Sequence, residues 1–249
     1  MKLRRRSIKA GFTLVETVMA MGIITIMITA FLAAFGPAVQ GIRKSISAKE
    51  ANRLSTSLEY ELSILRPGEE VTHPTSFAKA YTWIEESLST TKNNFVLIYQ
   101  YRGDPNNVRS DGTLEPYAGN DGLPGQDYVL QSVVRRLGDP NVASELAPGV
   151  VEGRVFYVRM KQLIFDSGEL VLTTSPGTII DPTEPRDAVT DHTDYPEAVI
   201  AFQAEFYVLK SSLSAYVNSP GFAFVDDNND GHPDATGKPA FVRNLAVRR

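Results

Sequence analysis

The chain has 249 residues, and 43% of them are hydrophobic, which is enough to build a folded core and excludes disorder of the whole chain. It has no cysteine, which excludes disulfides, a thiol nucleophile and a thiolate metal site. Five cations precede residue 12; without them 20 of the 25 basic residues remain against 29 acidic ones, and the resulting net charge of −9 argues against a nucleic-acid-binding surface.

The N-terminus combines a basic leader with a long uncharged stretch. Residues 1–11 are short and basic, and no charged residue occurs from Thr17 to Ile42. A helix needs about 20 apolar residues to cross a bilayer. We therefore predict a membrane-spanning helix, with the N-terminus in the cytoplasm because the cations precede the span. The rest of the chain is expected on the far side.

A secretory signal peptide and an unprocessed signal anchor both fit this segment less well. The apolar region of a secretory signal peptide is about 7–15 residues long and ends at a small-residue cleavage site, whereas here the apolar run is longer and Gly11 precedes it. An unprocessed signal anchor leaves Glu16 without a role, because a carboxylate in an apolar span is costly without a partner. A position of Glu16 at the level of the lipid headgroups is the simplest alternative.

One motif joins these features: Lys9-Ala10-Gly11-Phe12-Thr13-Leu14-Val15-Glu16. It resembles the processing signal of type IV prepilins, and the resemblance covers about the first 65 residues. It implies that a prepilin peptidase cuts between Gly11 and Phe12 and methylates the new amine. It further implies that Glu16 pairs with the amine of a neighbouring subunit during filament assembly. The chain departs from major pilins in its late proline, Pro37, where we expect a kink or a melted turn after Gly36.

The resemblance and the apolar pattern together divide the chain into four expected parts. Beyond the span, apolar residues recur at helical spacing on one face and stop at Arg66-Pro67-Gly68: Ile46, Leu54, Leu58, Leu62 and Leu65. A separate linker helix is the alternative. The expected parts are the leader 1–11, the transmembrane or filament-core helix 12–42, an amphipathic continuation 43–66 and an extracytoplasmic, β-rich head 67–249.

The pattern of the head indicates a set of strands separated by turns and long loops. The expected strands are 95–101, 154–160, 162–165, 169–174, 198–209, 223–225 and 240–247, with 128–136 either strand or helix, and Asp166-Ser167-Gly168 as a hairpin turn. Long loops are expected at 103–127 and 175–196. The predicted fold class is therefore α+β, with a long hydrophobic helix packed on a mainly antiparallel sheet.

A calcium site is predicted near the C-terminal end of the head. Asp226, Asn228, Asp230 and Asp234 alternate as oxygen ligands do in calcium loops, with Gly231 at the turn. Gly237 stands where an EF-hand has its bidentate glutamate, so an ordinary EF-hand is excluded. Some pseudopilins of type II secretion systems are known to bind calcium in a C-terminal loop. An Asp/Asn/Gly turn between two strands is the competing interpretation.

The remaining polar clusters carry less information. The acidic and amide residues of one long loop are interpreted as solvated: Asp104, Asn106, Asp111, Asn120, Asp121 and Asp127. The three histidines, His73, His192 and His232, are expected in surface loops, and Trp83 in the core. No motif of a hydrolase, metalloprotease, nucleotide-binding loop or dinucleotide fold is present.

The expected function is therefore assembly and not catalysis. The chain is interpreted as a minor pilin or pseudopilin of a type II secretion or type IV pilus-like machine in the bacterial inner membrane. Its expected partners are the prepilin peptidase, other pilin subunits and the inner-membrane assembly platform. The alternatives are a pilus-tip adhesin that binds a surface or carbohydrate, and a signal-anchored periplasmic enzyme.

Overall fold

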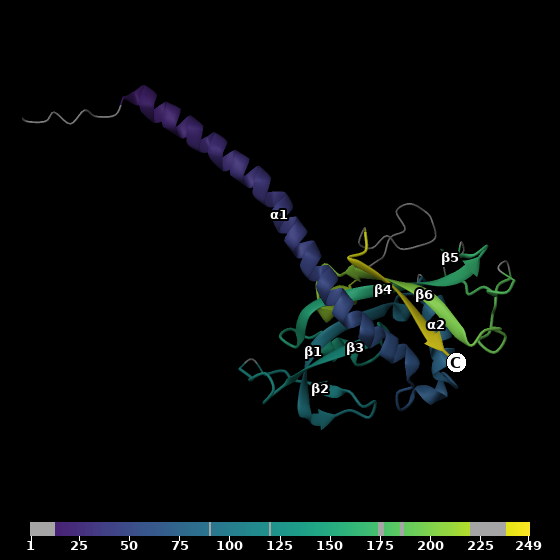
Figure 1. Cartoon of the computed structure of the whole chain (residues 1–249). Helices are drawn as coiled ribbons and strands as arrows, with labels where there is room; N and C mark the ends of the chain where they lie inside the picture. Colours follow the sequence, from purple (N-terminus) through teal and green to yellow (C-terminus); the bar gives the residue numbers. More distant parts are fainter. Residues whose placement is uncertain (1–12, 90, 120, 174–176, 185–186, 220–237) are drawn as a thin grey trace, which may run out of the picture. The chain divides into compact units, whose positions relative to one another are not determined.

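The computed structural model describes residues 13–89, 91–119, 121–173, 177–184, 187–219 and 238–249 (Figure 1). The chain forms two compact units, Met1–Ile46 and Ser47–Arg249. In its described residues the first unit consists of the N-terminal part of one helix, and the second unit is the head. Gly11, Phe12 and the expected strand 223–225 lie outside the described residues.

The helix α1 spans Leu14–Ser63 and belongs to both units. It is helical through Pro37 without interruption, so the expected melted turn after Gly36 does not form. The helix ends three residues earlier than the predicted boundary at residue 66. Pro67 disfavours the helical conformation in the residue before it, Arg66. The backbone N–H of Arg66 donates to the Glu69 carboxylate at 2.8 Å and not to a helix carbonyl.

Five short helical elements complete the helical part of the described chain: η1 Glu69–Val71, α2 Ser76–Glu86, η2 Lys92–Asn94, α3 Val142–Glu145 and α4 Ser214–Val217. The sequence pattern did not reveal α2. Its start is fixed by Thr75, whose hydroxyl accepts the backbone N–H of Ala78 at 3.1 Å as an N-cap does.

The described strands form one antiparallel sheet, which confirms the predicted α+β class: β1 Val96–Val108, β2 Leu114–Pro116, β3 Val129–Arg136, β4 Val151–Asp166, β5 Glu169–Leu172, β6 Val199–Val208 and β7 Phe241–Arg248. The order is β2-β1-β4-β6-β7, with β3 paired to β1 and β5 paired to β4. Figure 1 shows these strands side by side in the head.

Three sequence predictions about strands need correction or completion. Segments 154–160 and 162–165 are one strand, β4, which pairs with β1 along its first half and with β6 along its second. Segment 128–136 is strand, as β3. The expected loop 103–127 is wrong at its start, because β1 continues to Val108 and turns into β2. Pro105 lies where the β1–β2 register shifts, as expected for a residue without a backbone donor.

The predicted hairpin turn after β4 is confirmed. Asp166 pairs with Glu169, so Ser167 and Gly168 form a two-residue loop. Both have positive φ, 51° and 91°, as a type I′ turn requires. The serine tolerates this conformation beside a glycine that adopts it readily.

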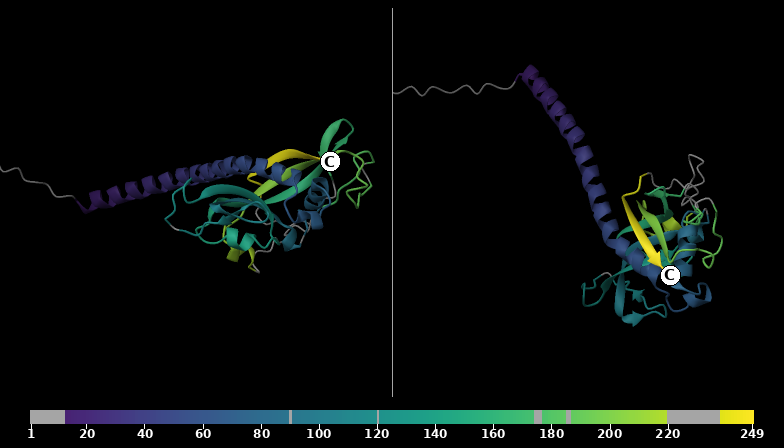
Figure 2. Two further views of the ribbon diagram at one scale, coloured as in Figure 1. Left: turned by 90° about the horizontal axis from the view of Figure 1, so that it is seen from below. Right: turned by 45° about the vertical axis from the view of Figure 1, so that its right-hand side comes forward.

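The core of the head lies on both faces of the sheet. On one face Ala51, Leu54, Leu58 and Leu62 of α1 pack with α2 against the strands, which confirms most of the predicted apolar stripe. Ile46 and Leu65 are the exceptions: Ile46 lies in the other unit and is exposed, and Leu65 follows the end of the helix and is only partly buried. On the opposite face, aromatic side chains of β1, β4 and β6 are buried together with Val142 of α3 and Val217 of α4. Figure 2 gives two further views of the head. Trp83 belongs to the first cluster, as predicted.

Candidate functional site

The first candidate site is the N-terminal part of α1, around Glu16. Helix α1 begins at Leu14, so Thr13 is the N-cap and Glu16 the third helical residue. The Thr13 hydroxyl accepts the Glu16 backbone N–H at 3.3 Å, while the Glu16 carboxylate accepts the Thr13 backbone N–H at 3.4 Å. This reciprocal pair is a capping box. Glu16 therefore lies at the helix end, where a carboxylate is stabilised by the helix dipole.

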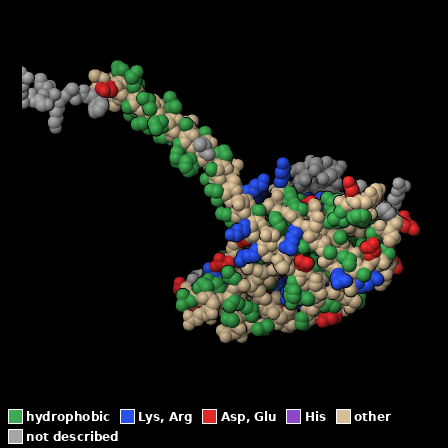
Figure 3. Space-filling model, in the orientation of Figure 1, with side chains coloured by type: hydrophobic (Ala, Val, Ile, Leu, Met, Phe, Trp, Pro, Cys, Tyr) green, Lys and Arg blue, Asp and Glu red, His purple; other side chains and the backbone are tan. Residues whose placement is uncertain are grey.

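The helix that follows can lie in hydrocarbon. Among the described residues one helix, α1, is long and apolar enough to cross a membrane, by length and composition. Figure 3 shows many hydrophobic side chains along its visible surface, with backbone and other side chains between them. The hydroxyls of Thr17, Thr25 and Thr29 donate to the backbone carbonyl four residues earlier, at 2.8–2.9 Å. These bonds satisfy polar groups that hydrocarbon would leave unpaired.

The predicted calcium ligands Asp226, Asn228, Asp230 and Asp234 lie outside the described residues, as does His232. Two of the described loop carboxylates act locally: Asp104 accepts the backbone N–H of Asn106, and Asp127 accepts that of Leu123. Asp111 corrects the prediction of a solvated cluster, because it also pairs with Arg135 of β3 at 2.7 Å. In the described part of the chain no three His, Cys, Asp or Glu side chains are grouped as a metal ion requires.

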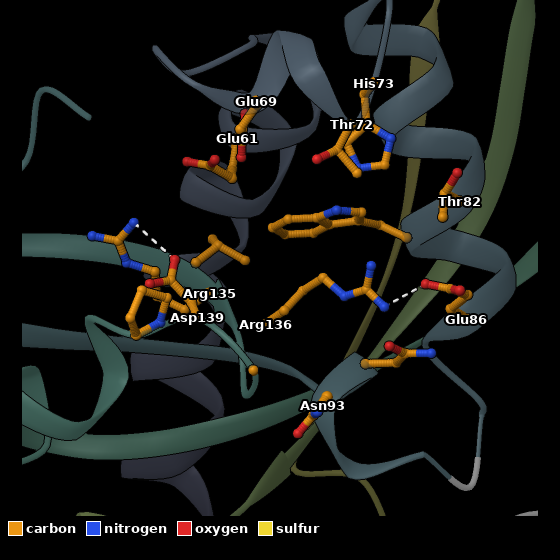
Figure 4. A pocket seen from close by; sticks show the side chains of 15 residues that line it. Glu61, Glu69, Thr72, His73, Thr82, Glu86, Asn93, Arg135, Arg136 and Asp139 are labelled. Atoms are coloured by element: carbon orange, nitrogen blue, oxygen red, sulfur yellow. Dashed lines mark hydrogen bonds and ion pairs between the residues drawn. The ribbon is translucent and has the colours of Figure 1, made fainter. Parts of the chain in front are cut away.

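The second candidate site is a cavity of about 530 Å³ between α2 and β3, here called the α2–β3 cavity. It is lined by side chains from the end of α1, from η1 and the loop after it, from α2, η2 and β3, and from the turn after β3. Figure 4 shows His73 and Thr72 on one side of it and Asn93 on the other. Arg136 and Glu86 form an ion pair across it (Figure 4).

One wall of this cavity is built on a buried group of charges. Lys79 of α2 is fully buried and pairs with Glu61 and Glu69, at 2.7 Å each. Arg66 pairs with Glu61 at 2.5 Å. Burial alone would raise the pKa of Glu61, but the hydrogen bonds and charges of Arg66 and Lys79 outweigh it and lower that pKa. These pairs join the last turn of α1 to α2.

A second buried group lies beneath α3. The Glu145 carboxylate is fully buried and accepts hydrogen bonds from Tyr99 at 2.6 Å, Arg109 at 2.5 Å and Arg135 at 2.8 Å. Burial, followed by the charge of Glu145, raises the pKa of Tyr99 well above its ordinary value. Although burial alone would raise it, the pKa of Asp111 is held at about 2 by hydrogen bonds from Thr113 and Arg135. All these contacts fasten α3 and the β1–β2 turn to the sheet.

The prediction that His73 lies in a surface loop was wrong in one respect, its exposure. The residue follows η1 in a loop, as predicted, but it is only 8% exposed and lines the cavity. Burial lowers its pKa. His192 lies in a turn and is half-buried, beside Asp191. The buried charges Glu61, Lys79 and Glu145 were missed because a lone charge in an amphipathic pattern carries no signal of burial.

Comparison with known proteins does not identify a family for this chain. No protein-family model matches the chain, and no curated protein and no solved structure is significantly similar to it. The described sites therefore have to be interpreted from their own chemistry. The N-terminal site contains one carboxylate at the start of an apolar helix. The α2–β3 cavity contains uncharged hydrogen-bonding side chains, and its charged side chains are paired with one another or with Lys79.

Proposed function

We propose that the protein is a minor pilin or pseudopilin, a structural subunit of a type II secretion or type IV pilus-like filament. The observation that carries the proposal is the motif from Lys9 to Glu16, directly followed by the uncharged residues 17–42. A helix over that stretch supports it, because a filament core and a membrane both need an apolar helix surface.

Glu16 has a defined part in this proposal. Among the described residues of the single chain, its carboxylate is held by the backbone and hydroxyl of Thr13 alone, at 3.4–3.5 Å, which are long hydrogen bonds. Cleavage before Phe12 creates a positive amine. Pairing of that amine with Glu16 of a neighbour replaces these long hydrogen bonds by an ion pair in an apolar environment, where an unpaired charge is costly. The pairing thereby sets the register between subunits.

The proposal also fixes location and partners. The subunit lies in the bacterial inner membrane, with its N-terminus in the cytoplasm and its head in the periplasm or outside the cell. Prepilin peptidase processes it, and the assembly platform and other pilin subunits receive it. Calcium binding by the loop 226–234 of the head stays a prediction.

The first test is the intact mass of the full chain from cells with and without prepilin peptidase. With the peptidase we expect the loss of residues 1–11 and the gain of one methyl group. Without it the chain should stay full length. The variant Gly11→Val should stay uncut in both strains, because a side chain at this position blocks close approach of the backbone to the enzyme. An uncut wild-type chain in both strains would refute the proposal and leave a plain membrane anchor.

A second test separates assembly from helix capping at Glu16. We expect Glu16→Gln to be cleaved normally but to be lost from the sheared filament fraction, since it removes the charge and keeps the shape. Thr13→Val removes the capping hydroxyl and keeps the carboxylate, at a cost of about 1 kcal/mol to the helix end. It should therefore still be incorporated. Equal loss of both variants from the filament would assign Glu16 to capping alone.

A further inference from the structure

The α2–β3 cavity contains uncharged polar side chains that have no hydrogen-bond partner. These are Thr72, His73, Thr82, Asn93 and Asn94. None of their side chains bonds to any residue in the described part of the chain. Thr72 and Asn93 are exposed, Thr82 and Asn94 are partly buried and His73 is buried, so the set can contact a ligand that enters the cavity from solvent.

His73 distinguishes this cavity from a solvated groove. Its side chain is more than nine-tenths buried, and its ring points toward the cavity (Figure 4). The low pKa that burial imposes keeps the ring neutral at pH 7. A neutral imidazole presents one donor and one acceptor. The ring nitrogens stay open to the cavity, where a bound ligand can form hydrogen bonds with them.

The charged groups of the cavity are already neutralised within the protein. Glu61 and Glu69 pair with Lys79, Glu86 pairs with Arg136, and Asp139 pairs with Arg135. A charged ligand would have to compete with these ion pairs or enter without a counter-charge. The cavity is therefore complementary to a ligand that has no net charge.

We propose that the α2–β3 cavity binds a neutral saccharide of one or two sugar rings. A sugar presents many hydroxyls on a small apolar frame, which matches the uncharged donors and acceptors and the Trp83 side chain in the lining. The volume of about 530 Å³ lies within the range of small-ligand sites. Among the described strands β3 pairs with β1 alone, so an extended peptide along its other edge is the alternative occupant that the test has to exclude.

The test is titration calorimetry on the full chain in a detergent without a sugar headgroup. The probes are di-N-acetylchitobiose, cellobiose and maltose, with glucuronic acid as the charged counterpart. We expect at least one neutral disaccharide to bind, and glucuronic acid to bind at least tenfold more weakly. His73→Ala and Asn93→Ala should each weaken binding by about 3- to 10-fold, the effect of one lost hydrogen bond.

Two variants serve as controls. His192→Ala changes the other described histidine, and Thr56→Ala changes a second cavity beside α1, so both should bind as the wild type does. Trp83 fluorescence during heating shows that each variant is folded. Absence of binding by all three neutral disaccharides at millimolar concentration overturns the proposal, and so does wild-type affinity in His73→Ala. Binding of an uncharged peptide and of no saccharide would assign the cavity to a peptide. None of these outcomes depends on cleavage before Phe12, so the two proposals fail separately.

Discussion

Replacing Lys79 by methionine should lower the free energy of unfolding by about 3–5 kcal/mol, since it leaves the carboxylate of Glu61 buried with only one cation. The methionine side chain matches the length of the lysine stem, so the loss is electrostatic and not a cavity effect. Trp83 is the single tryptophan of the chain, and the Lys79 ammonium lies 4.9 Å from its ring centre. Denaturant unfolding followed by tryptophan fluorescence therefore reports on this site directly.

Two further variants define what the Lys79 result means. Lys49→Met removes an exposed lysine of α1 and should change the stability by less than about 0.5 kcal/mol. The double variant Lys79→Met with Glu61→Leu removes both charges of this pair, and replacing a buried pair by apolar side chains is often neutral. It should regain only part of the loss, because Arg66 then loses its contact with Glu61. A cost of less than about 1 kcal/mol for Lys79→Met would mean that water reaches the pair.

Glu145→Gln is expected to have an effect of similar size, about 3–5 kcal/mol. The substitution keeps the shape of the side chain but removes the negative charge shared by Arg109 and Arg135, which are themselves almost completely buried. The amide also cannot accept from Tyr99, Arg109 and Arg135 as a carboxylate does. Near-ultraviolet circular dichroism of the tyrosines, recorded during denaturant unfolding, measures the change.

The matched control for this variant is Glu115→Gln. Glu115 pairs with the same Arg109, at 3.0 Å, but it is 54% exposed. Its loss should cost at most about 1 kcal/mol, because water screens an exposed pair. Similar costs for Glu115→Gln and Glu145→Gln would show that burial does not set the strength of this network, contrary to its geometry.

The sequence predicted the parts of the fold that depend on a local pattern. The apolar positions Leu54, Leu58 and Leu62 recur at helical spacing, and they are buried on the sheet. The turn at Ser167-Gly168 needs two positive φ angles, which the local residues indicate on their own. Both features were predictable because neighbouring residues determine them.

The parts that the sequence did not reveal depend on distant partners. The segment of α2 looks mixed, since Lys79 interrupts its apolar face, and the lysine is tolerated only because Glu61 and Glu69 meet it from elsewhere. Strand β4 appeared as two strands around the polar Lys161, although it is one strand that pairs on both sides. His73 gave no signal of burial, because the walls of its cavity are far apart in sequence.

The position of β7 has a consequence for how the head reaches its native state. This last described strand pairs with β6 along its whole length, and its Leu245 and Val247 enter the same core as Leu54 and Leu58. Arg243 donates to Ser55 of α1 at 2.7 Å. Contacts between residues so far apart in sequence form late, because closing long loops costs entropy before any contact repays it. A head that is synthesised from its N-terminus thus stays incompletely closed until its final strand has been made, which leaves one edge of β6 unpaired and open to misassembly in the meantime.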